Sequence, residues 1–79
     1  MRLTEWNEVL KYAEELCEEY KEFLRPEVYT ICDGRRGIWL NLYDNKCNIF
    51  KQFASGTFDT VEQYKIALRY QFSNAVAWI

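Results

Sequence analysis

The chain has 79 residues, a formal net charge of −2 and no histidine. A chain of this length forms one domain, residues 1–79, near the lower limit for folding without disulfides or metal ions. Aromatic residues make up 18% of the composition, and each buried ring removes roughly 150–250 Å² from water. Gly and Pro are scarce, which excludes a disordered linker.

No run of about 18 apolar residues is present to cross a membrane, and no apolar leader segment is visible. The three cysteines are odd in number and widely spaced, unlike the disulfide framework of a small secreted domain. We therefore expect reduced thiols, no membrane association and a cytoplasmic location. Cys17, Cys32 and Cys47 are interpreted as small buried hydrophobic residues.

Residues 4–24 are predicted to form one long amphipathic helix. Thr4 is the expected N-cap, and Pro26 is expected to end the helix because the residue before a proline avoids helical dihedral angles. The apolar positions step by three and four residues, which keeps them on one stripe. These positions are Trp6, Val9, Leu10, Ala13, Leu16, Cys17, Tyr20, Phe23 and Leu24.

Three strands are predicted next, at residues 28–32, 38–43 and 47–53. The turns between them, at 33–37 and 44–46, are so short that the strands must pair antiparallel. The middle strand alternates between two sets of side chains, one facing the helices and one facing away. The inner set is Ile38, Leu40 and Leu42, and the outer set is Trp39, Asn41 and Tyr43.

A second helix is predicted after Asp59, which forms a capping-box pattern with Glu62. Its apolar stripe is Val61, Tyr64, Leu68, Phe72, Ala75 and Ile79. The predicted fold class is α+β, with helix-strand-strand-strand-helix order and a three-stranded antiparallel sheet packed against two helices. The predicted core is Leu10, Leu16, Leu40, Leu68 and Phe72.

No catalytic, cofactor-binding or metal-binding residues are predicted. Histidine, the commonest general base and metal ligand, is absent, and the cysteines lack the close pairing of a zinc site. Gly34 and Gly37 flank a turn between strands, whereas a phosphate-binding loop joins a strand to a helix. The many carboxylates lie in an exposed stretch that supplies no perturbed acid or base. We therefore expect a protein that is not an enzyme.

Charge is distributed unevenly along the chain. Residues 4–24 carry a net charge of −5 and the remainder +3. A helical projection of this segment predicts an acidic stripe that would suit a basic protein partner. The same stripe is also what an ordinary solvated helix face presents. Its members are Glu8, Tyr12, Glu15, Glu19 and Glu22.

The outer face of the sheet is the second candidate surface. Trp39 and Tyr43 are expected there, with Tyr29 or Phe50 beside them, as a docking or self-association face. In the alternative arrangement one helix covers each face, and these aromatic residues belong to the core. Arg35 and Arg36 at a hairpin tip are a further candidate anchor, since arginine is enriched at interface hot spots.

The element order is similar to that of double-stranded-RNA-binding domains. The resemblance implies a lysine cluster at the start of the second helix, but residues 58–65 are acidic rather than basic here. With a sequence pI of about 5.1, direct nucleic-acid binding is not expected.

The chain also resembles the small acidic inhibitors that phages and mobile elements encode, notably the anti-CRISPR proteins. The resemblance rests on size, acidity and architecture, and no motif carries it. It implies a non-catalytic protein that docks on a basic surface of a nuclease or CRISPR effector. An antitoxin or immunity protein is an alternative, as is a homodimeric structural protein that pairs through its sheet face.

Overall fold

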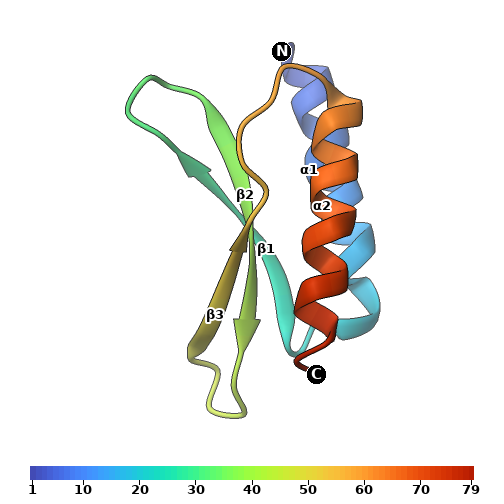
Figure 1. Cartoon of the computed structure of the whole chain (residues 1–79), viewed down its shortest axis with the longest axis vertical. Coiled ribbons are helices and arrows are strands. Elements are labelled where there is room, and N and C mark those ends of the chain that lie inside the picture. Colours follow the sequence, from blue (N-terminus) through green and yellow to red (C-terminus); the bar gives the residue numbers. More distant parts are fainter.

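The computed structural model describes residues 1–79 and confirms the predicted order of elements and the α+β class (Figure 1). Both helices lie on the same side of one three-stranded sheet. The elements in chain order are α1 (Leu3–Cys17), a 3₁₀ turn η1 (Glu18–Tyr20), β1 (Leu24–Thr30), β2 (Arg36–Tyr43), β3 (Ile49–Ala54) and α2 (Val61–Val76). No helix combines the length and apolar composition that crossing a bilayer requires.

The sheet has the order β1-β2-β3 with antiparallel pairing throughout. β2 is central, and the register shifts between Leu42 and Tyr43 where β3 carries a bulge. α1 packs on β1 and on α2, while α2 covers β2 and β3. The alternative with one helix on each face is therefore wrong, and no helix covers the outer face of the sheet (Figure 1).

The first helix is shorter than the predicted span 4–24. It begins at Leu3, where the Glu5 carboxylate accepts the backbone N–H of Arg2 at 3.1 Å, and it ends at Cys17. Its last turn holds no basic residue, so the carboxylates around it meet the negative end of the helix dipole uncompensated. The chain then tightens into η1, which returns it to the sheet at Leu24.

Pro26 does not terminate the helix but lies inside β1. It pairs with Leu40 on an edge strand, at a position where a peptide N–H would point away from β2, so the ring costs no ladder hydrogen bond. β1 accordingly begins at Leu24 rather than Val28.

The other boundaries move by one or two residues. β3 starts at Ile49 rather than Cys47, because Cys47 adopts a positive φ of 63° in the preceding turn. α2 is capped by Thr60, whose hydroxyl accepts the backbone N–H of Gln63 while the Gln63 side chain accepts that of Thr60, each at 3.2 Å. The capping box therefore begins one residue after the predicted Asp59.

The core fills the space between the two helices and the inner sheet face. Ile38, Leu40 and Leu42 point inward as predicted, and Leu40 and Leu68 are fully buried. The other three predicted core residues, Leu10, Leu16 and Phe72, are only partly buried at its margin. Ile79 was expected on the buried stripe of α2 but is 51% exposed, because α2 ends at Val76.

Truncation of the central core residue should be costly. We expect Leu40→Ala to lower the free energy of unfolding by roughly 2–5 kcal/mol, the range for a leucine cavity in a packed core. The matched control is Leu3→Ala, since Leu3 is 70% exposed and its loss should cost less than about 0.5 kcal/mol. Urea denaturation followed by circular dichroism measures both, and equal midpoints for the two variants would contradict this assignment of the core.

Candidate protein-binding surfaces

The three thiols do not share one environment. Cys17 is buried in the core, whereas Cys32 and Cys47 are exposed, so the expectation of three buried cysteines is wrong for two of them. Both exposed residues lie in hairpin turns outside the strands. Burial raises the pKa of Cys17 to about 11, so its thiolate is scarce near neutral pH. No group of three or more His, Cys, Asp or Glu side chains is placed to hold a metal ion.

The predicted acidic stripe divides into two parts. Glu8 forms an ion pair with Lys65 of α2 at 3.2 Å, and the same ammonium group lies 5.4 Å from the centre of the Tyr12 ring. Glu8 and Tyr12 are thus engaged where α1 meets α2. Glu19 lies in η1 and Glu22 in the following turn, so the helical projection that aligned them with Glu8 does not hold.

An acidic segment remains at the C-terminal end of α1. Residues 11–22 carry five glutamates against two lysines. Glu15 is exposed there, and a single ion pair, Lys21 to Glu18 at 3.5 Å, neutralises part of the charge. We call this stretch the acidic segment, and its carboxylates are Glu14, Glu15, Glu18, Glu19 and Glu22.

Aromatic residues on the outer sheet face cover one another. Trp39 stacks on Tyr29 with ring centres 4.8 Å apart, and the Arg25 guanidinium lies 5.2 Å from the centre of the Tyr43 ring. The predicted position of Tyr29 is confirmed, and Gly37 makes room for it: a Cβ there would lie 2.3 Å from the Tyr29 ring. Trp39 and Tyr43 are partly buried as a result.

A row of polar side chains crosses the same face between these aromatic pairs. The Asn41 amide donates to Glu27 at 3.4 Å and accepts from Gln52 at 3.0 Å. Asn41 is fully buried although no helix covers it, so the outer face is packed by its own side chains. The outer sheet face is therefore a weaker candidate for docking than we predicted from the alternation of residues along the middle strand.

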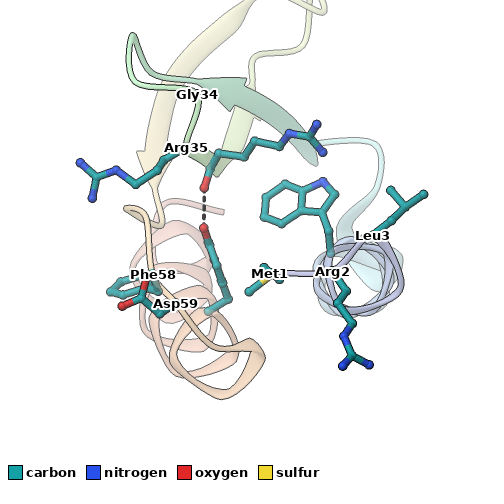
Figure 2. Close-up of a pocket in the computed structure, with 10 residues that line it drawn as sticks. Met1, Arg2, Leu3, Gly34, Arg35, Phe58 and Asp59 are labelled. Atoms are coloured by element: carbon teal, nitrogen blue, oxygen red, sulfur yellow. Dashed lines mark hydrogen bonds between the residues drawn. The ribbon is translucent and has the colours of Figure 1, made fainter.

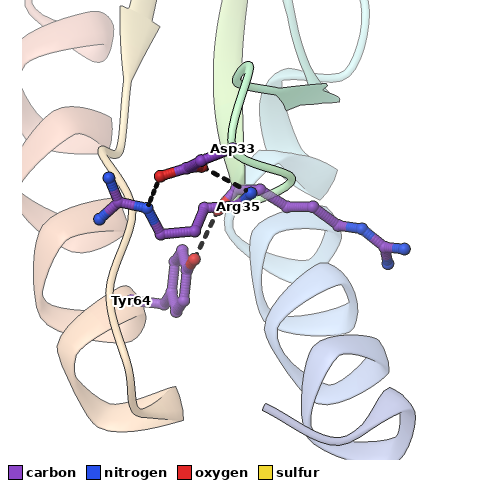
Figure 3. Close-up of polar contacts among 4 residues, drawn as sticks. Asp33, Arg35 and Tyr64 are labelled. Carbon is purple, nitrogen blue, oxygen red and sulfur yellow. Dashed lines mark hydrogen bonds and ion pairs between the residues drawn. The ribbon is translucent and has the colours of Figure 1, made fainter.

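The arginines at the β1–β2 hairpin are partly occupied. Arg35 donates to the Asp33 carboxylate through its backbone N–H and its Nε, at 3.0 and 2.7 Å (Figure 3). The backbone hydrogen bond is the larger cause, and the side-chain hydrogen bond the next, of a pKa of Asp33 below its usual value. Arg36 lies over the Trp6 ring at 5.9 Å. Its carbonyl accepts the hydroxyl of Tyr64.

A cavity of about 390 Å³ opens between this hairpin and the starts of both helices. Its aromatic lining comes from Trp6, Phe58 and Tyr64. Arg2 and Arg35 point outward on different sides of it (Figure 2), so their guanidinium groups do not converge on a common point. The cavity therefore lacks the converging positive groups of an anion-binding site.

An exposed aromatic cluster lies at the opposite end of the molecule and was not predicted from the sequence. Phe50 and Trp78 meet edge to face at 5.7 Å, and the Lys51 ammonium group lies 4.2 Å from the centre of the Trp78 ring. These two aromatic residues are 58% and 54% exposed. We call this cluster the aromatic end; it surrounds a hollow of about 360 Å³ lined by Phe23, Leu42, Tyr43, Asp44, Phe50, Trp78 and Ile79.

Three chain segments that are distant in sequence build the aromatic end. They are the turn after η1, the β2–β3 hairpin and the residues that follow α2, which gather at the lower end in Figure 1. Phe23 is fixed by two backbone hydrogen bonds, one from its N–H to Tyr20 and one from the N–H of Tyr43 to its carbonyl, at 2.8 and 2.7 Å. Because Glu22 directly precedes Phe23, the acidic segment borders the aromatic end.

No family model, curated protein or solved structure matches this chain.

The exposed and buried thiols should differ in reactivity. In the folded protein at about pH 8, iodoacetamide should modify Cys32 and Cys47 and leave Cys17 intact until denaturant is added, because only a thiolate that solvent reaches is alkylated. Intact-mass spectrometry over time counts the adducts. Three adducts formed at one rate without denaturant would contradict the burial of Cys17.

Proposed function

We propose that this chain is a non-catalytic protein-binding module that docks through its aromatic end onto a partner with a basic surface. The observation that carries the proposal is the adjacency of an exposed aromatic cluster and the acidic segment at one end of the molecule. An apolar centre with a charged margin is the usual composition of a protein–protein interface.

The aromatic end supplies the centre of such an interface. Contiguous exposed apolar side chains on a small domain mark interaction sites, and tryptophan is among the residues that dominate binding energy. Trp78 is held by Phe50 and Lys51, so less side-chain entropy is lost when a partner covers it. The hollow beside it can receive an apolar side chain of the partner.

The acidic segment selects the partner by charge. Its net charge is −3, from five glutamates and two lysines. Opposite charge on a partner raises the association rate. Proteins that handle nucleic acid present basic surfaces because they contact phosphates. We therefore propose a nuclease or other nucleic-acid-binding complex, such as a CRISPR effector, as the partner, which the chain would inhibit by occupying its basic channel.

The two parts of the surface should affect different rate constants. Trp78→Ala and Phe50→Ala should speed dissociation of the complex, since they remove buried contact area. A variant that combines Glu15→Gln, Glu19→Gln and Glu22→Gln should associate more slowly. Its association rate should also depend less on salt, because exposed charges are screened over about 8–10 Å. Surface plasmon resonance at two salt concentrations, with a candidate nuclease complex immobilised, measures both rates.

Matched controls come from the far end of the molecule. Asp59→Asn and Glu62→Gln remove two carboxylates near the start of α2, and Leu3→Ala removes an exposed apolar side chain there. All three variants should bind like the parent chain. If these controls weaken binding as much as the aromatic and acidic variants do, the proposed surface is wrong.

A further inference from the structure

The two edges of the sheet are not equally protected against pairing with another strand. β1 has Pro26 in its middle, with Arg25 and Glu27 on either side, which are the features that keep natural sheet edges from associating. β3 reads Ile-Phe-Lys-Gln-Phe-Ala, with no proline or glycine and a single charge, and nearly all of it is exposed. Its edge is open to a further strand.

Unpaired peptide groups line this open edge. The N–H of Ser55 donates to the carbonyl of Ile38 at 2.9 Å, and Trp39 pairs with Ala54. In an antiparallel ladder this register turns the peptide groups of Phe53 and Lys51 toward β2, and those of Gln52 and Ala54 outward. The Ala54 carbonyl accepts the side-chain amide of Gln71 at 3.0 Å, whereas both peptide groups of Gln52 face solvent.

The polar row on the outer sheet face also ends at this edge. It runs from Glu27 through Asn41 to Gln52. The Gln52 side chain gives its N–H to Asn41, and its oxygen has no hydrogen-bond partner within the chain. A second glutamine amide placed opposite would complete the row, because an amide carries both a donor and an acceptor.

We infer that β3 pairs antiparallel with β3 of a second copy of this chain, about a two-fold axis at Gln52. Each Gln52 would then exchange both backbone hydrogen bonds with its counterpart, and the bulge at Phe50 would fall outside this pair. Lys51 would lie opposite Phe53 of the second copy on the inner face. The product is one continuous sheet of six strands with helices on one side.

This register is better than its neighbours. Centring the axis on Lys51 would place two ammonium groups directly opposite each other, which is unfavourable. Centring it on Phe53 would place Gln52 opposite Ala54, so the two Gln52 amides would not meet, and it would need the Ala54 carbonyl that already accepts from Gln71. The Gln52 register brings the two Gln52 amides together on the outer face and keeps the side chains of residues 51–53 on their own faces.

The neighbouring face of α2 supports a second copy as the occupant. Ile66 and Tyr70 are 60% and 68% exposed, and with Ser55 and Phe58 they line a hollow of about 430 Å³. The hydrogen bond from Gln71 to Ala54 shows that this side of α2 borders the open edge. A second copy seated on β3 brings its own α2 to this side, which would cover apolar surface that a lone peptide strand leaves exposed.

A cysteine cross-link tests the register directly. Paired residues at such a position have Cα atoms about 5.5 Å apart, within the range that a disulfide spans. In a chain carrying Cys32→Ser and Cys47→Ser, we expect Gln52→Cys to form a covalent dimer under mild oxidation with copper–phenanthroline. The control, Glu27→Cys in the same background, lies on the other edge of the sheet and should remain monomeric on non-reducing gels.

Sedimentation equilibrium of the unmodified chain is the second measurement, and it should give twice the chain mass over a concentration series. Gln52→Lys should shift this mass to that of the monomer while circular dichroism stays unchanged, because it places like charges opposite each other. A monomeric parent chain at all concentrations, or equal cross-linking at Gln52→Cys and Glu27→Cys, would overturn the inference. The inference does not depend on the proposed function, since a monomer could still bind a basic partner through its aromatic end.

Discussion

The structure depends on one packing constraint: two helices must bury their apolar stripes on the same face of a three-stranded sheet. Leu24, Ile38 and Leu40 are fully buried at the centre of that face, and Leu68 from α2 and Val9 from α1 close over them. A chain of this size has a single small core. The position of each helix over the sheet therefore decides which side chains the core can cover and which it leaves outside.

Two surfaces are consequences of this arrangement. The outer sheet face has no helix above it, and it is packed by its own side chains through the Tyr29–Trp39 stack and the buried Asn41. The aromatic end has no such cover, because the turn after η1 and the residues after α2 line its hollow and do not close over it. Phe50 and Trp78 stay exposed there, next to carboxylates that the short α1 leaves at its C-terminal end.

The order of elements and the inner sheet face could be predicted from the sequence, because the alternation of Ile38, Leu40 and Leu42 and the short turns are local signals. The end of α1 could not be predicted so well. Pro26 suggests a helix stop by its local preference, but the strand pairing of Leu24 with Leu42 recruits it into an edge strand. The aromatic end was missed because Phe23, Phe50 and Trp78 meet only in three dimensions. The predicted stripe of the second helix runs to Ile79, so no sequence signal indicated that Trp78 lies beyond the end of α2.

The central claim is that the aromatic end and the acidic segment form one binding surface. Hydrogen–deuterium exchange of the chain with and without a bound nuclease complex tests it most directly. We expect protection to be confined to residues 18–23, 43–50 and 76–79, which surround the hollow beside Trp78. Protection confined instead to residues 25–29 and 39–42, on the outer sheet face, would contradict the claim.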